Sequence, residues 1–134
     1  MKILVAYDGS QPARRALQWA TQIQGPPHVT IIGVIQTLAG SEKIADAIDP
    51  VVDLADHNRQ LKEAAETLAA AGITAHITEA AGNPAEEIIT TADAGDYDLI
   101  IVGATGAHLV RRFLVGTVAD RVVRHSTRPV LVVR

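Results

Sequence analysis

Residues 73–80 read ITAHITEA and alternate between apolar and polar side chains. Ile73, Ala75 and Ile77 fall on one face of an extended strand, and two threonines and a histidine on the other, because side-chain directions alternate along a strand. A polar face of this kind is typical of an edge strand, since the central strands of a parallel sheet are covered on both faces and apolar throughout. We therefore expect Ile73–Ala80 to lie at an edge.

Four more apolar runs predict strands, and each is separated from the next by a stretch long enough for a helix. Parallel strands need such crossovers, so the pattern predicts an α/β fold, a five-stranded parallel sheet with helices on both faces. The order 2-1-3-4-5 would place the third strand in the centre, and 3-2-1-4-5 places it at an edge, so we expect 3-2-1-4-5. The predicted strands are Lys2–Tyr7, His28–Val34, Ile73–Ala80, Asp98–Val102 and Pro129–Val133.

The predicted helices are marked by residues typical of helix ends. Ser10 and Asn83 predict N-caps, and Gly72 predicts a C-terminal stop. Helices are expected over residues 10–23, 51–71, from 83 onward and 116–125, with loops over 35–49 and 103–115. Apolar positions at helical spacing predict the buried sides. These are Ala13, Ala16, Leu17 and Ala20 in the first helix, Leu54, Leu61, Ala65 and Leu68 in the second, and Val118, Val122 and Val123 in the last.

The composition limits the class of protein. The chain has 134 residues, of which 48% are hydrophobic and 20% charged, which fits a single domain over 1–134 and excludes a disordered chain. A net charge of −3 and 3% aromatic residues leave no footprint for nucleic acid. The absence of cysteine excludes disulfides and thiolate chemistry. No stretch approaches the ~18–20 apolar residues of a membrane span, so we expect a cytoplasmic protein without a nucleic-acid or membrane partner.

The predicted strand order reverses between the first and fourth strands, and ligands of such sheets bind at that switch point. The loops there are Asp8-Gly9-Ser10 and the segment from Gly103 to Gly116, with the spacing G-x2-G-x9-G-T. Glycines let main-chain N–H groups approach a ligand, and the N-terminus of a helix attracts anions. The segment therefore predicts a phosphate site, with the alternative that its glycines are turn residues and Thr117 only a helix cap.

Other phosphate-binding motifs are absent. The chain contains no GxxxxGK[ST] motif and no GxGxxG after its first strand, which excludes a P-loop enzyme and a Rossmann dehydrogenase. A receiver domain would need an aspartate after the third strand, where Ala80-Ala81-Gly82 stands instead.

Three motifs together resemble the universal stress protein family. They are Val5–Ser10 (VAYDGS), Gly82–Ile88 (GNPAEEI) and the G-x2-G-x9-G-[ST] segment with the VADRVVRH and PVLVV runs that follow it. The resemblance covers the whole chain and points to the ATP-binding branch of the family. It implies the same 3-2-1-4-5 sheet, of the adenine nucleotide alpha-hydrolase-like kind.

The resemblance also implies roles for individual residues toward ATP, with Mg²⁺. Asp8 would face the ribose and phosphates or the divalent ion, although it could instead cap the following helix. The main chain of Ala6 and Tyr7 would line the base pocket, and Val34 would contact the adenine. The ribose and triphosphate would be held by Gly103, Gly106, Gly116, Thr117 and Val118, with Gly82 near the rim.

We expect a regulatory stress-response role, in which bound nucleotide orders the 103–115 loop through unequal affinity for two states. Slow ATP hydrolysis is a second hypothesis, but no convincing base is present, and His108 and Asp120 are only conceivable ones. Arg111 and Arg112 could reach phosphate oxygens, but we expect them, like His108, to be solvated. A third hypothesis is an interaction protein that binds no nucleotide, and a fourth is a protein that binds a different nucleotide, such as cyclic AMP.

The last predicted strand is apolar and lies at the second edge of the sheet. An exposed apolar edge invites pairing with another strand, and the family resemblance points the same way. We therefore expect a homodimer formed through Val130, Leu131, Val132 and Val133.

Overall fold

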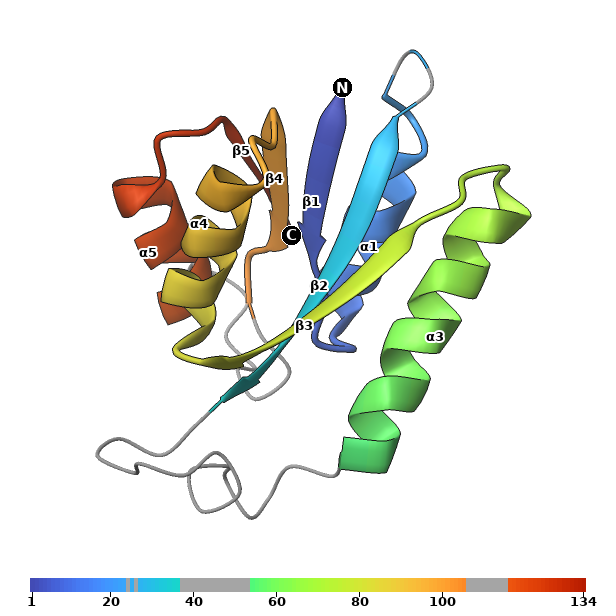
Figure 1. The fold of residues 1–134 in the computed structure, drawn as a ribbon, viewed down its shortest axis with the longest axis horizontal. Helices are drawn as coiled ribbons and strands as arrows, with labels where there is room; N and C mark the ends of the chain where they lie inside the picture. The colour runs from blue at the N-terminus through green and yellow to red at the C-terminus, as the bar shows by residue number, and fades with distance from the viewer. Residues whose placement is uncertain (24, 26, 37–53, 106–115) are drawn as a thin grey trace.

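The computed structural model describes residues 1–23, 25, 27–36, 54–105 and 116–134. Strands and helices alternate along the chain (Figure 1). The elements are β1 (Lys2–Ala6), α1 (Gln11–Ala20), β2 (His28–Gln36), α3 (Leu54–Ala70), β3 (His76–Gly82), α4 (Pro84–Ala94), β4 (Leu99–Gly103), α5 (Thr117–His125) and β5 (Val130–Val133). Most of the loop predicted over 35–49, the predicted start of the second helix at Val51 and nearly all of the 103–115 loop lie outside these residues.

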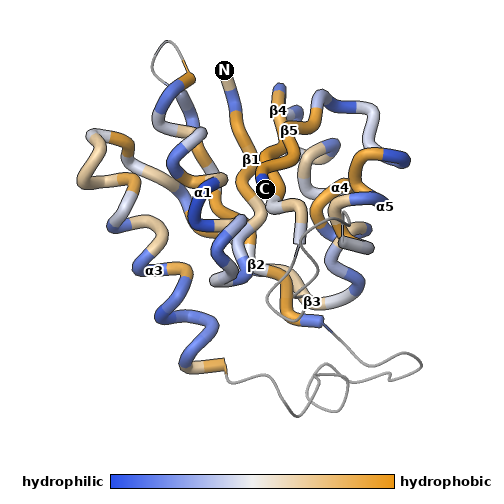
Figure 2. The backbone as a smooth tube through the Cα atoms, turned by 180° about the vertical axis from the view of Figure 1, so that it is seen from behind, coloured by the Kyte–Doolittle hydropathy of each residue, from blue (hydrophilic) through white to orange (hydrophobic). Residues whose placement is uncertain are grey.

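The described strands form one parallel five-stranded sheet in the order β3-β2-β1-β4-β5, so the predicted order is confirmed. Helices α1 and α3 cover one face of the sheet, and α4 and α5 cover the other (Figure 1). In Figure 2 the strands β1, β4 and β5 are largely apolar, whereas α3 carries long polar stretches. The sheet is therefore buried between two layers of amphipathic helices, as parallel sheets require.

The predicted bounds of β3 were wrong at both ends. The N–H of Ile73 donates to the carbonyl of Leu68 at 2.9 Å and closes the end of α3, so this residue is held by the helix and cannot join the strand ladder. Pairing begins at Thr30↔His76 and continues to Gln36↔Gly82. The edge position itself was predicted correctly, and 43% of the Ile77 side chain is exposed.

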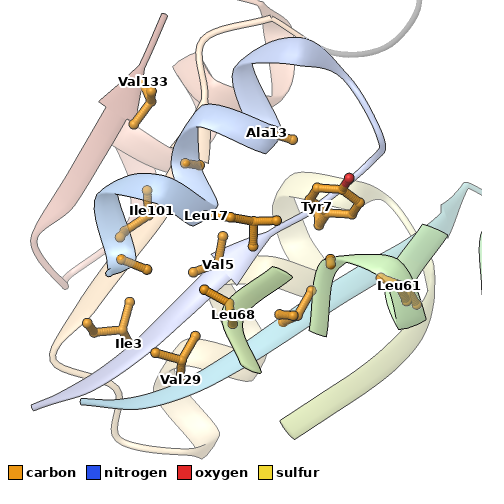
Figure 3. Packing of buried hydrophobic residues seen from close by; sticks show 14 residues of the cluster. Ile3, Val5, Tyr7, Ala13, Leu17, Val29, Leu61, Leu68, Ile101 and Val133 are labelled. Carbon is orange, nitrogen blue, oxygen red and sulfur yellow. The ribbon is translucent and has the colours of Figure 1, made fainter. Parts of the chain in front are cut away.

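Two apolar clusters lie on the two faces of the sheet. Figure 3 shows the cluster beneath α1 and α3, in which side chains of β1 and β2 pack against Leu17, Leu61 and Leu68. The second cluster packs α4 and α5 against Leu4 and Ile100. The four residues predicted as the buried side of α1 are all buried. Both clusters are mainly aliphatic, as the low aromatic content requires, with Tyr7 in the first and Tyr97 in the second.

The buried sides of the other two helices differ in part from the prediction. In α5 the sheet-facing residues are Val118, Ala119 and Val122, and Val123 is 50% exposed. Each helical residue turns by about 100°, so Val123 points away once Val122 faces the sheet. In α3 the first-turn Leu54 is 45% exposed, and the buried positions are Leu61, Ala64 and Leu68, with Ala65 partly buried as expected.

The predicted N-caps Ser10 and Asn83 and the predicted stop at Gly72 are confirmed, whereas the first helix ends at Ala20 and not at Ile23 as predicted. The Ser10 Oγ accepts a hydrogen bond from the Ala13 N–H at 3.2 Å, and the Asn83 Oδ1 accepts one from the Glu86 N–H at 3.2 Å. Gly72 has a φ of +84° and ends α3, a left-handed conformation that glycine adopts without a steric cost. The local sequence therefore determines where α1 and α4 begin and where α3 ends.

The amino ends of the strands are tied by polar side chains. The buried Tyr97 hydroxyl donates to the Thr30 Oγ1 at 2.7 Å. Arg128 donates to the Tyr97 carbonyl at 3.1 Å and forms ion pairs with Asp93 at 3.3 Å and Asp96 at 3.0 Å. The hydrogen bond to Asp96 is the main cause of the raised pKa of Arg128. The Lys2 ammonium lies over the Tyr97 ring, 4.6 Å from its centroid, so β1, β2, β4 and β5 are joined at this end.

Candidate functional site

The loops that follow β1 and β4 meet at the carboxyl ends of these paired strands. The register pairs Val5 with Ile101, so both chains leave the sheet at nearly the same level. The Ser10 hydroxyl donates to the carbonyl of Thr105 at 3.5 Å. This contact joins the first predicted site segment to the start of the second, at the point where the strand order reverses.

The loop after β1 presents Asp8 on a short turn. One carboxylate oxygen of Asp8, Oδ1, accepts a hydrogen bond from the Ser10 N–H at 2.9 Å, which is an Asx turn. Gly9 has a φ of +81°, and Asp8 is exposed. Since Ser10 is the N-cap of α1, the hypothesis that Asp8 caps this helix is wrong.

The side chain of Tyr7 belongs to the core. The residue is 8% exposed, and Figure 3 shows its ring among the apolar side chains at the end of β1. Its N–H donates to the Ile32 carbonyl at 3.0 Å. Ala6 and Tyr7 therefore present only their main chain at the end of the strand, because the Tyr7 ring packs in the core under the helices.

Gly103, at the end of β4, lies directly beneath the first turn of α1. A Cβ at this position would lie 2.9 Å from the Pro12 Cβ and 3.0 Å from the Ala13 nitrogen. Real Cβ atoms do not approach other atoms this closely, so a larger residue would push α1 away from the strand. The structural requirement for glycine here is therefore helix packing.

The N-terminus of α5 lies beside the end of β4. The Gly116 N–H donates to the Ala104 carbonyl, and the Ala104 N–H donates to the Val133 carbonyl at 2.6 Å. Gly116 is the N-cap and offers no side-chain cap, so the hypothesis that Thr117 caps the helix is wrong. As at every helix start, the first N–H groups, here those of Thr117, Val118 and Ala119, find no acceptor within the helix itself. They give this end of the helix a positive potential.

The remaining predicted residues are more widely distributed. Val34 is partly buried against the second cluster and pairs with Ala80. Gly82 ends β3 with a φ of +150°. The Glu87 Oε1 lies 2.7 Å from the position of an ideal Cβ at Gly82, so the carboxylate occupies the space of the missing side chain. The single N–H at the Arg124 Nε is shared between the two carboxylate oxygens of Asp120, each at 3.0 Å, so this carboxylate is paired within α5. Gly106, His108, Arg111 and Arg112 lie outside the described residues.

Metal-binding clusters are not evident in the part of the chain that the structure describes. Within those ranges, no group of three or more histidine and acidic side chains could hold a metal ion. Asp8 is the acidic residue that the structure places at the strand ends with the two loops. Such a site fits a cation that takes most of its ligands from a phosphate and from water, as Mg²⁺ does.

Sequence reasoning missed the contribution of α3 to this end of the sheet. The Gln60 carboxamide lies over Gly9, and Leu61 and His57 lie over Gly33. The His57 Nε2 is buried without a hydrogen-bond partner among the described residues. A glycine inside the apolar run of β2 is a signal for close approach of another segment, but no pattern in the sequence marks Gln60.

Arg59 forms the outer side of this part of α3. It pairs with Asp56, and with Glu63 at 3.2 Å. The hydrogen bond to Asp56 is the first cause of the raised pKa of Arg59, followed by the charges of Asp56 and Glu63. The guanidinium therefore stays charged, and it is occupied by acidic residues of its own helix.

None of the helices within the described ranges is both long enough and apolar enough to cross a bilayer. The helices instead cover the sheet, and their polar sides face outward (Figure 2).

Comparison with known proteins agrees with this architecture. The sequence profile of the universal stress protein family matches residues 1–134. The universal stress protein YxiE of Bacillus subtilis is 33% identical over 146 residues, which cover 99% of this chain and 98% of that protein. Among solved structures, the universal stress protein UspA from Lactobacillus plantarum matches with a TM-score of 0.83 at 26% identity, covering 100% of this chain and 97% of the other. A universal stress protein in complex with cAMP matches with a TM-score of 0.75 at 26% identity and the same two coverages. The chain belongs to the universal stress protein family.

Proposed function

We propose that this protein binds an adenine nucleotide, ATP with Mg²⁺, across the carboxyl ends of β1 and β4. The observation that carries the proposal is the N-terminus of α5, which has no side-chain cap and is joined through Ala104 to the end of β4. The Asp8 loop reaches the same place through the contact between Ser10 and Thr105. A relative of similar fold was solved with cAMP, which supports an adenine nucleotide as the ligand class.

The roles follow from the chemistry of each group. The first-turn N–H groups of α5 and the Thr117 hydroxyl would bind phosphate oxygens, and the main chain of Gly116 and Val118 would lie against them. The Asp8 carboxylate would accept from the ribose or bind Mg²⁺ held by the phosphates. The main chain of Ala6, Tyr7 and Val34 would contact the adenine. Because Gly103 has no side chain, α1 can pack closely against β4, and this would keep the Asp8 loop close to the phosphates.

A regulatory role follows if the nucleotide binds two states of the protein unequally. A ligand shifts a conformational equilibrium only by its difference in affinity for the two states. Of the two conceivable bases, Asp120 is paired with Arg124, and His108 lies outside the described residues. We therefore propose binding and release, with hydrolysis at most slow, as the basis of a stress-response function.

The decisive experiment places a negative charge at the start of α5. Thr117→Glu should weaken ATP binding at least about tenfold in calorimetry, since a carboxylate would compete with phosphate for the positive helix end. The same carboxylate favours the helix, so the thermal midpoint should not fall. Arg121→Gln is the matched control, because it changes the net charge equally at an exposed position of the same helix.

Parallel titrations with ATP, AMP and cAMP would identify the preferred nucleotide, and native mass spectrometry of freshly purified protein would reveal a nucleotide that co-purifies. Unchanged ATP affinity in Thr117→Glu would refute the placement of the phosphates. No binding of any of the three at millimolar concentration would favour an interaction protein without nucleotide.

We also propose a homodimer through β5. Strand β5 pairs with β4 on one side, and no other strand of the described residues pairs with its second side. Val130, Leu131 and Val132 are half-buried. A hollow of about 370 Å³ lies beside this edge, between β5 and the α1 residues Trp19 and Gln22. Light scattering at micromolar concentration should give twice the monomer mass, and a monomer there would refute the proposal.

A further inference from the structure

The loop after β1 is in contact with a side chain from a distant helix. An ideal Cβ at Gly9 would lie 2.7 Å from the Gln60 Oε1 and 2.8 Å from its Cδ. The Gln60 carboxamide therefore occupies the space of the side chain that Gly9 lacks. Because Gly9 also has a φ of +81°, this turn is adapted to the carboxamide both in backbone conformation and in shape.

Gln60 is itself held in place by its own helix. Its Nε2 donates to the Asp56 Oδ2 at 3.0 Å, and Asp56 is also paired with Arg59. Arg59 in turn pairs with Glu63 at 3.2 Å. The carboxamide is thus oriented by polar neighbours on α3, one turn before it and beside it.

A second contact keeps this part of α3 from sliding along the sheet. An ideal Cβ at Gly33 would lie 2.8 Å from both terminal methyl groups of Leu61 and 2.9 Å from the His57 Nε2. Gly33 lies in β2, the strand next to β1. Helix α3 therefore fits against Gly33 within β2 through Leu61 and His57, and against Gly9 in the loop after β1 through Gln60.

We propose that Gln60 is a positioning residue, which holds the Asp8–Ser10 loop in its turn and couples α3 to the nucleotide site. The nucleotide part rests on the proposed function, whereas the hold on the loop is a property of the chain alone. Coupling between two sites is reciprocal. A partner that displaces this half of α3 would weaken nucleotide binding, and bound nucleotide would in turn stabilise α3 against the sheet.

The first experiment measures the loop in the nucleotide-free protein. Hydrogen exchange followed by NMR should show faster exchange at the Gly9 and Ser10 N–H groups in Gln60→Ala, because the turn loses the group packed on it. Asn58→Ala is the matched control, since it removes an exposed amide from the same helix. Unchanged exchange in Gln60→Ala would overturn the proposal, whatever the protein binds.

The second experiment is a double-mutant cycle read out as ATP affinity. Gln60→Ala should weaken binding about three- to tenfold, and the combined loss should be less than the sum of the two single losses, since Gly9→Ala disrupts the same contact in addition to straining the turn. Gln60→Met, which fills the same space, should retain most of the affinity. Additive losses, or equal losses in the Ala and Met variants, would overturn the coupling.

The two experiments also separate this proposal from the proposed function. Faster loop exchange in Gln60→Ala, together with no nucleotide binding by the unmodified protein, would refute the nucleotide site and support the hold on the loop. ATP binding by the unmodified protein with unchanged exchange and affinity in Gln60→Ala would refute the positioning role and leave the nucleotide site standing.

Discussion

The two ends of the sheet are built in different ways. At the amino ends of the strands, polar side chains satisfy one another, as in the bond from Tyr97 to Thr30 and the ion pairs of Arg128. At the carboxyl ends the described polar groups include main-chain groups at the start of α5, whose N-cap Gly116 has no side chain, and at the turn around Gly9. The side-chain network at the amino ends leaves few polar groups for a ligand, whereas the main-chain groups at the carboxyl ends leave several.

This difference indicates that stability and binding are concentrated at opposite ends. A side-chain network holds its partners in place by specific bonds, and removing one member leaves the others unsatisfied. A main-chain surface depends on close packing instead, because the segments that carry it must approach without side chains between them. The comparison therefore predicts that substitutions of closely packed residues at the carboxyl end alter both stability and nucleotide affinity, whereas those in the side-chain network at the amino end alter stability alone.

The largest effect is expected at Gly103. Gly103→Ala places a Cβ against the Pro12 and Ala13 backbone, and overpacking of this kind costs roughly 1–3 kcal/mol. The displaced α1 would carry the Asp8 loop with it, so ATP affinity should fall as well. Urea unfolding and calorimetry measure the two changes.

Gly25→Ala is the control for this substitution. Gly25 has a φ of +89° and nothing within 4 Å of an added Cβ, so only backbone strain should lower stability, and ATP affinity should be unchanged. Gly103→Ala with unaltered affinity would contradict the claim that packing and binding are linked at this end.

The strand order and the helix ends could be predicted from sequence because they depend on local chemistry. The polar side of β3 is enough to place that strand at an edge, and Ser10, Asn83 and Gly72 mark helix ends through bonds to residues a few positions away. The start of β3 could not be predicted, because Ile73 has the character of a strand residue but its N–H is taken by Leu68. Whether such a residue joins the helix end or the strand depends on tertiary contacts that the local sequence does not show.

The position of the candidate site could be predicted from the sequence, whereas its contact with α3 could not. Asp8 and Gly116 follow from their place at the switch point, where the strand order alone brings two loops together. The contact of Gln60 with Gly9 could not be predicted, because it joins residues that are distant in sequence and depends on how α3 lies on the sheet. The exposure of Val123 was missed for a similar reason, since periodicity gives the spacing of a helix face and not its direction.

A smaller effect, on stability alone, is expected at Tyr97. Tyr97→Phe leaves the nearly buried Thr30 hydroxyl without its donor and should lower the free energy of unfolding by about 1–2 kcal/mol. Adding Thr30→Val removes the second polar group and should restore part of this loss. Chemical denaturation of the two single variants and the double variant measures the coupling.

ATP affinity should be the same in all three of these proteins. An affinity that falls in parallel with stability at Tyr97, at the opposite end from the proposed site, would show that the two ends are not separable. The comparison between the ends of the sheet would then have to be abandoned.

The smallest effect is expected at Asp120, in the first turn of α5. Its carboxylate is half-exposed and paired with Arg124, and exposed pairs of this kind contribute only about 0.3–0.5 kcal/mol. Asp120→Asn should therefore change stability little, but it removes a negative charge close to the helix start proposed to bind phosphate. ATP affinity should rise about twofold at low salt and approach that of the unmodified protein as salt screens the charge. A fall in affinity, or a rise that salt does not reduce, would mean that the phosphates do not lie at α5.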